Sequence, residues 1–133
     1  TDVNRTHPIV NPRDPVIVLS IRQPNGTWSS STVWTVRDDA TRPQVLVDES
    51  AGTVYAFASL PGTGGAIYVK AAAIANPVFQ TGRGTVLLSV GEINNVTTTK
   101  QTVRLADGIL VLAGDTVSHT YWHAYLTPKS SIK

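Results

Sequence analysis

Cysteine and methionine are both absent from the 133 residues of this chain. Without cysteine, the protein can have neither disulfide bonds nor thiolate ligands for a metal ion. Because the sequence starts at Thr1 and contains no methionine, we expect it to be a processed product or a piece of a longer precursor. A leader peptide removed by such processing would no longer be visible in the sequence.

Long apolar runs and charged residues are also scarce. The apolar runs have the length of strands and fall well short of the roughly 18 residues that a membrane-spanning helix needs, so we expect no membrane span. Charged residues make up 15% of the chain, the formal net charge is +2, and the basic residues are scattered. The sequence therefore predicts no nucleic-acid partner.

Glycine and proline, with ten and eight copies, divide the chain into short segments that are rich in β-forming residues. Residues 42–89 contain four apolar runs bounded by turn-forming residues. These runs are residues 45–47, 53–58, 66–70 and 85–89. Their length and spacing predict a four-stranded antiparallel meander of about 50 residues, the size of a propeller blade.

The chain before this meander predicts a lead-in followed by a hairpin. Residues 1–15 contain three prolines and are expected to be extended, with a short edge strand at residues 9–10. Residues 16–22 and 31–36 read as strands joined at Asn25-Gly26, because both residues tolerate positive φ.

One run inside the meander has a helical composition. It is VKAAAI at residues 69–74, which Asn76-Pro77 soon follows, so a loop or a single turn is expected there.

The chain after the meander repeats the strand pattern of the meander. Residues 90–99 read as a polar loop, and residues 100–103, 109–113 and 121–126 resemble the first three strands of the meander. Aligning the third strands makes Val18, Tyr68 and Trp122 equivalent, with a repeat of about 50 residues.

The predicted fold is therefore all-β, with antiparallel four-stranded meanders forming a partial β-propeller over residues 16–133. It divides into two outer strands at 16–36, a complete blade at 42–89 and an incomplete blade at 100–126. A compact β-sandwich of the same strands is the alternative.

Seven short segments are informative: NGTW (25–28), DDATRP (38–43), GGAIY (64–68), GRGT (82–85), INNVT (93–97), TKQ (99–101) and YWH (121–123). In this order they resemble a family of bacterial secreted or surface β-propellers with sialidase-like repeats. The resemblance covers about residues 14–126 and implies the C-terminal blades of a longer propeller, located outside the cell or on its surface. Of the sialidase Asp-box, S-x-D-x-G-x-T-W, only Gly26-Thr27-Trp28 is present, and Pro24 takes the Asp position. This remnant supports the fold and not catalysis.

Two cations are candidate ligand-binding residues. Arg42 and Lys100 occupy matching positions at the starts of two expected inner strands, and Gln44 and Gln101 accompany them. Inner strands line the channel of a propeller, where two such cations could hold the carboxylate of an anionic sugar. The alternatives are pairing with a nearby carboxylate such as Asp38, or solvation.

No catalytic set is predicted. Glycoside hydrolysis usually needs two carboxylates at one site, or a tyrosine with an acidic partner. Asp48 and Glu49 are adjacent and would face opposite sides of a strand, and Asp107 and Asp115 lie in turn sequences. The histidines lack metal-ligand spacing, so neither a metal nor a cofactor is expected.

The densest aromatic cluster lies in residues 121–126. Strand alternation places Tyr121, His123 and Tyr125 on one face and Trp122 on the other. We expect Trp122 to be buried between blades.

The sequence thus predicts a non-enzymatic extracellular propeller segment that acts in binding or assembly. Its expected partners are further blades, from the same precursor or another chain, with a carbohydrate as an open alternative. Two other functions stay open: a fragment of a sialidase-like glycoside hydrolase, and a structural subunit of a surface filament.

Overall fold

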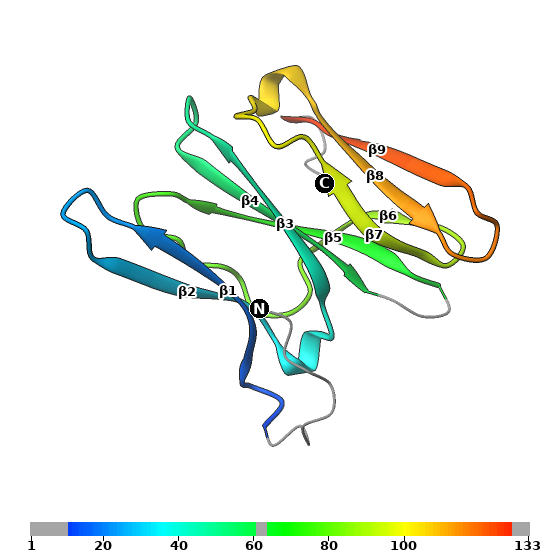
Figure 1. The fold of residues 1–133 in the computed structure, drawn as a ribbon, viewed down its shortest axis with the longest axis horizontal. Coiled ribbons are helices and arrows are strands. Elements are labelled where there is room, and N and C mark those ends of the chain that lie inside the picture. Colours follow the sequence, from blue (N-terminus) through cyan, green and yellow to red (C-terminus); the bar gives the residue numbers. More distant parts are fainter. Residues whose placement is uncertain (1–10, 61–63, 129–133) are drawn as a thin grey trace.

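The computed structural model describes residues 11–60 and 64–128, which form nine β-strands in three sheets (Figure 1). The first sheet contains β1 (Pro15–Arg22) and β2 (Trp28–Thr35). The second sheet contains β3 (Thr41–Asp48), β4 (Thr53–Leu60), β5 (Ala66–Ala73) and β6 (Thr85–Ser89). The third sheet contains β7 (Ile93–Thr98), β8 (Ile109–Asp115) and β9 (Tyr121–Leu126). Two short 3-10 helices, η1 (Val36–Asp38) and η2 (Leu105–Asp107), precede β3 and β8.

The predicted all-β class is confirmed, because every strand pair in the described residues is antiparallel and no α-helix occurs among them. The predicted hairpin and four-stranded meander are also present. Within the described part of the chain, no helix is long and apolar enough to cross a membrane. Most of the predicted lead-in, including the edge strand at residues 9–10, lies outside the described residues.

Two strand predictions were wrong in position. The third sheet begins with β7 at Ile93, inside the predicted polar loop, and residues 100–103 form no strand. Ile93 and Val96 are both buried, but a bulge between them hides the period-2 alternation that would reveal the strand. The alanine-rich run is also a strand, because β5 pairs with β4 along its whole length up to Ala73. This long-range pairing overrides the local helical preference of alanine.

The first strands of the second and third sheets, β3 and β7, each contain a β-bulge at the same position. Arg42 and Pro43 lie together opposite one residue of β4, and Asn95 and Val96 lie together opposite one residue of β8. The first residue of each pair has a left-handed backbone, with φ of 51° at Arg42 and 54° at Asn95. Because the bulges coincide, the second and third sheets can be aligned residue by residue.

The strands β2 and β6 share a second bulge, in which Val33 and Leu87 are the extra residues. Alignment on this bulge makes Val18 equivalent to Tyr68, and alignment of β4 with β8 makes Tyr68 equivalent to Trp122. The register of the strands thus agrees with the repeat of about 50 residues predicted from the sequence.

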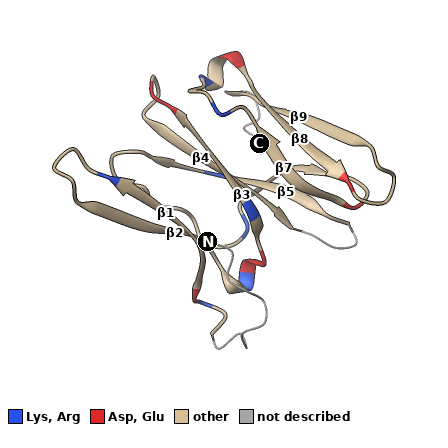
Figure 2. Ribbon diagram, viewed as in Figure 1, with Lys and Arg blue, Asp and Glu red and all other residues tan. Residues whose placement is uncertain are grey.

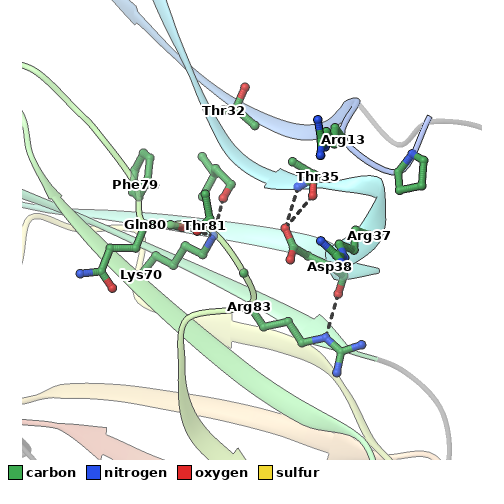
Figure 3. Close-up of a pocket in the computed structure, with 13 residues that line it drawn as sticks. Arg13, Thr32, Thr35, Arg37, Asp38, Lys70, Phe79, Gln80, Thr81 and Arg83 are labelled. Atoms are coloured by element: carbon green, nitrogen blue, oxygen red, sulfur yellow. Dashed lines mark hydrogen bonds between the residues drawn. The ribbon is translucent and has the colours of Figure 1, made fainter.

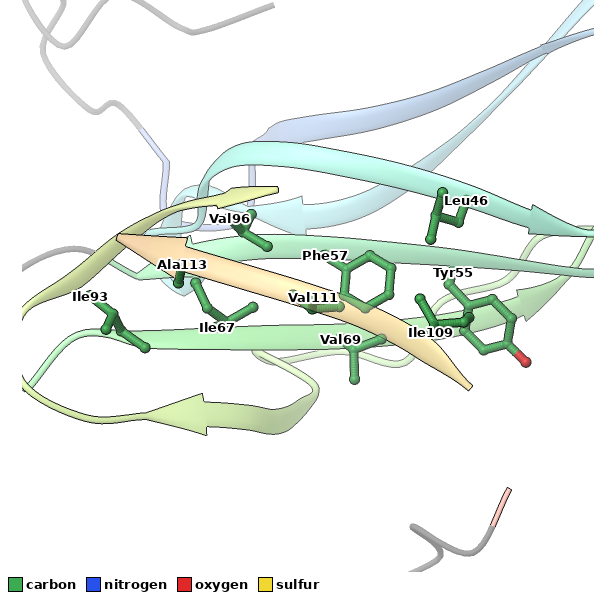
Figure 4. Packing of buried hydrophobic residues seen from close by; sticks show 10 residues of the cluster. All are labelled: Leu46, Tyr55, Phe57, Ile67, Val69, Ile93, Val96, Ile109, Val111 and Ala113. Carbon is green, nitrogen blue, oxygen red and sulfur yellow. The ribbon is translucent and has the colours of Figure 1, made fainter. Parts of the chain in front are cut away.

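The sheets stack in chain order, and Figure 1 shows them following one another from β1–β2 to β7–β9. The first seam, between the first and second sheets, packs Val33 and Trp34 against Ala56 and Ala58. The second seam, between the second and third sheets, is larger (Figure 4). Its buried core consists of Leu46, Tyr55, Phe57, Ile67, Val69, Ile93, Val96, Ile109, Val111 and Ala113.

The two seams use equivalent faces. Ala56 and Ala58, which face the first sheet, are equivalent by register to Val111 and Ala113, which face the second sheet. The middle sheet is therefore covered on both faces, and each sheet presents the same face to the sheet that follows it.

The turn between β1 and β2 is a short bulged hairpin, and it lies at Asn25-Gly26 as the sequence predicts. The Gly26 N–H donates to the Gln23 carbonyl at 2.9 Å, and the Asn25 side chain accepts from the Thr27 N–H at 3.0 Å. Within this turn, only Gly26 has a positive φ, of 88°.

We predict that Gly26→Val lowers the free energy of unfolding by about 1 kcal/mol or more, since a β-branched residue resists positive φ. A Cβ at this position would come no closer than 3.7 Å to Arg22, so the backbone and not a clash causes the loss. Thermal unfolding checks the result, with Gly26→Asn as the control, because asparagine tolerates the left-handed region better. Equal melting temperatures for Gly26→Val and the wild type would contradict the assignment.

Candidate functional site

The predicted ligand residues lie on two different elements of the fold. Arg42 and Gln44 are on β3, whereas Lys100 and Gln101 lie in the connection after β7 and not at the start of an inner strand. The bulge register makes Asn95, not Lys100, the counterpart of Arg42.

Arg42 also has a neutral partner. Its Nη1 donates to Asn94 Oδ1 at 3.1 Å, which joins the second sheet to the third. The cavity that Arg42 lines is otherwise formed by residues 16–18 and 40–43, and neither Lys100 nor the two glutamines line it. The proposed pairing of Arg42 with Lys100 therefore has no support in this geometry, and ligand binding by each of the four residues stays a prediction.

The aromatic strand β9 confirms one prediction and corrects another. Trp122 pairs with Ala113 and so faces the second seam, whereas Tyr121 and His123 point to the other side, as expected. Trp122 is nevertheless 41% exposed and is not buried between sheets. The reason is its place in the sheet: among the described residues, no strand pairs with the outer edge of β9.

The outward face of the third sheet is partly apolar, and no sheet of the described residues covers it. We call it the β7–β9 outer face, and it includes Leu110, Leu112, Tyr121, His123 and Tyr125. By register, Leu112 is the counterpart of Phe57, and Tyr121 is the counterpart of Ile67. Phe57 and Ile67 are fully buried, whereas Tyr121 is 82% exposed. The face that is covered in the second sheet is therefore open in the third.

A second candidate feature is a cavity of about 820 Å³ beside the first seam, which we call the basic cavity. It lies between the β1–β2 hairpin with η1 and the segment 79–83 (Figure 3). Figure 2 shows basic and acidic residues side by side at η1, which forms one wall. The charged residues that line it are Arg13, Arg37, Asp38, Lys70 and Arg83.

Lys70 is the buried cation of this cavity, and only 6% of its surface is exposed. Its Nζ donates to the main-chain carbonyls of Val33 at 2.7 Å and Gln80 at 2.8 Å, and it lies 5.1 Å from the centre of the Trp34 ring. Burial lowers the pKa of Lys70, and the negative charge of Asp38 partly opposes this shift. The ammonium is thus held in place by neutral acceptors and an aromatic face.

Four further residues beside the cavity, Trp34, Thr35, Asp38 and Arg83, are linked by hydrogen bonds. Asp38 Oδ2 accepts from the Thr35 N–H and from Thr35 Oγ1, both at 2.9 Å, and so caps η1. Arg83 Nε donates to the Asp38 carbonyl at 3.2 Å, and the Trp34 indole N–H donates to the Arg83 carbonyl at 2.9 Å. These bonds fix the segment that carries Arg83 against the first sheet.

The basic cavity was not predicted from the sequence. Lys70 was assigned to a strand without any functional role, and only its position inside an apolar run marked it. A charged residue among buried neighbours is a signal, because lysine is almost never fully buried unless it is paired.

Within residues 11–60 and 64–128, no group of three or more histidine, aspartate or glutamate side chains is placed to hold a metal ion. The two buried aspartates outside the basic cavity, Asp48 and Asp115, are engaged in turns and connections.

Asp48 accepts from Ser50 Oγ at 2.6 Å, from the Ala51 N–H at 3.0 Å, and from the Leu105 N–H at 2.8 Å. Hydrogen bonds from the Ser50 hydroxyl, and then from the Leu105 N–H, lower the pKa of Asp48. Hydrogen bonds from the main-chain N–H groups that follow Asp115 lower the pKa of Asp115 in the same way. These hydrogen bonds stabilise the charged form of each carboxylate, and in doing so they stabilise the folded state.

We predict that replacing Asp48 and Asp115 together by Asn flattens the acid dependence of stability. Because the pKa of each carboxylate is lower in the folded state, the unfolded chain binds more protons in acid. The stabilisation is therefore complete above about pH 4 and is lost as the pH falls through the lower folded-state pKa. Urea unfolding midpoints between about pH 2 and pH 6 check this. The exposed Glu49→Gln is the control, and an unchanged slope in the double variant would contradict the prediction.

Comparison with protein-family models, with curated proteins and with solved structures finds no match to this chain.

Proposed function

We propose that this chain is a non-enzymatic segment of a β-propeller, in which the three sheets are successive blades and the segment acts in binding or assembly. The observation that carries the proposal is the repetition of both bulges and of the same stacked faces at the two seams. The resemblance of the sequence to secreted sialidase-like propellers supports the same interpretation and an extracellular or cell-surface location.

The stacking favours an arc of blades over the alternative β-sandwich. In a sandwich, two sheets share one core and their outer faces meet solvent. Here both faces of the second sheet are buried: Phe57 of β4 is buried at the seam with the third sheet, and Ala58 of β4 is buried at the seam with the first sheet. Such head-to-tail packing leaves unlike faces at the two ends of the stack, and further blades can be added at these ends until a ring closes.

The open end of this stack supports a further blade as the partner. The β7–β9 outer face is equivalent to the face of the second sheet that the third sheet covers, so a further blade is the occupant that fits it. We propose that this blade comes from the same precursor. It would present small apolar side chains, as Ala56 and Ala58 do at the first seam and Val111 and Ala113 do at the second.

Sedimentation of the chain alone tests the proposal. Without its partner blade, the chain is expected to self-associate through the β7–β9 outer face, because an open apolar sheet face is seldom tolerated by a monomer. Tyr121→Lys should reduce this association, whereas Val117→Lys, at an exposed site in the β8–β9 turn, should not. A monomer that unfolds cooperatively at all concentrations would overturn the proposal and favour the compact sandwich.

The glycosidase alternative has a separate test. The described residues supply no catalytic pair, so no turnover of fluorogenic glycosides is expected. Turnover that is lost in Arg42→Ala, together with unchanged folding, would replace the binding function by the enzymatic one.

A further inference from the structure

We infer that the basic cavity binds a small organic carboxylate with an apolar body, and that Lys70 is its buried cationic contact. The inference stands apart from the proposed blade assembly, because the cavity lies at the first seam and the β7–β9 outer face lies at the far end of the stack.

The charge of the cavity favours an anion. Among the described residues, four cationic side chains line it, from Arg13, Arg37, Lys70 and Arg83, against the single carboxylate of Asp38. One oxygen of that carboxylate is already engaged by Thr35. The wall is therefore net positive, and a cleft with low-dielectric walls concentrates the potential of such charges.

Lys70 has one donor to spare. An ammonium group carries three N–H donors, and two of them are used on the Val33 and Gln80 carbonyls. Val33 is the bulged residue of β2, so the bulge presents a carbonyl to Lys70. A buried ammonium bonded to neutral carbonyls gains most from an anionic third partner, because charge-assisted hydrogen bonds are the stronger kind.

The stacking of sheets does not require this lysine. By register, the position of Lys70 at the first seam corresponds to Ala124 at the second seam, where the sheets also pack. Because the equivalent position in the third sheet is an alanine, a lysine is not needed for one sheet to pack on the next. Lys70 therefore has a role that is specific to the first seam.

The remaining lining specifies the rest of the ligand. Phe79 and Val33 give the cavity an apolar wall, and Figure 3 shows Phe79 on the side of the cavity away from Arg83. A ligand with a carboxylate next to a compact apolar group would satisfy both the cations and this wall. Benzoate has this combination and serves as the probe.

The experiment titrates the ¹⁵N-labelled chain with sodium benzoate at constant ionic strength and follows the Trp34 indole N–H, which donates to the Arg83 carbonyl at the cavity wall. A saturable shift of this resonance is expected with benzoate. Benzamide, which has the same shape without the charge, should leave the resonance unmoved, and so should sodium sulfate, which lacks the apolar group.

The variants identify the contact. Lys70→Met should weaken benzoate binding about tenfold or more, because it removes a buried charged donor. If that variant fails to fold, the exposed Arg37→Gln replaces it, with an expected loss of several-fold and an unchanged unfolding midpoint. Arg104→Gln, an exposed site away from the cavity, is the matched control. The inference is overturned by equal responses to benzoate and benzamide, by an equal response to sulfate, by no saturable response, or by unchanged benzoate affinity in the folded variants.

Discussion

Replacing Trp34 by alanine is expected to lower the free energy of unfolding by about 3–5 kcal/mol, the range typical of a fully buried aromatic residue. The side chain has no exposed surface and packs at the first seam against the small residues of β4. Its indole N–H is satisfied by the Arg83 carbonyl, and its ring faces the Lys70 ammonium. The substitution would leave a cavity, an unpaired carbonyl and a buried cation that has lost its aromatic partner.

Urea unfolding measures this loss, and Trp28→Ala is the control of the same residue type. Trp28 is 66% exposed at the end of the first hairpin, so its removal should change the free energy of unfolding by no more than about 0.5 kcal/mol. Similar losses in the two variants would mean that the first hairpin does not pack on the second sheet.

The strands could be predicted where composition and turns agreed. The runs around β4 and β8 are apolar and bounded by turn residues, and tertiary pairing reinforces what the local sequence favours. The strand β7 could not be predicted in this way, because its bulge places Ile93 and Val96 on the same buried side three residues apart. That spacing breaks the period-2 pattern on which strand prediction depends.

The candidate sites depended on information that is not local. The alternation in β9 gave the correct faces for Tyr121 and Trp122, but their exposure depends on which strands and sheets lie beside them. Lys70 likewise became a candidate only when the fold placed Arg37 and Arg83 around the same cavity. Described residues from four separate segments line this cavity, namely 12–13, 32–38, 70 and 79–83. Their spacing along the chain does not indicate that they lie together.

The second large effect is expected at the second seam. Phe57→Ala should lower the free energy of unfolding by about 3–5 kcal/mol, because the ring is fully buried among side chains of both the second and the third sheets (Figure 4). Phe57→Leu keeps most of the apolar volume and should cost clearly less. Urea unfolding followed by tryptophan fluorescence measures both variants, and a loss below about 1 kcal/mol for Phe57→Ala would contradict the packing of the two sheets.

Leu112 gives this prediction its sharpest comparison, since it occupies in the third sheet the position that Phe57 occupies in the second. It is only half-buried because no described element covers the β7–β9 outer face. Leu112→Ala should therefore cost about 1 kcal/mol in the dissociated monomer, at concentrations too low for the self-association expected of the chain alone. If a further blade covers that face in the assembled protein, the cost of Leu112→Ala should rise there towards that of Phe57→Ala. The difference between the two costs therefore measures coverage: a large loss for Leu112→Ala in the monomeric chain would show that the outer face is already packed, and would contradict the open arc of blades.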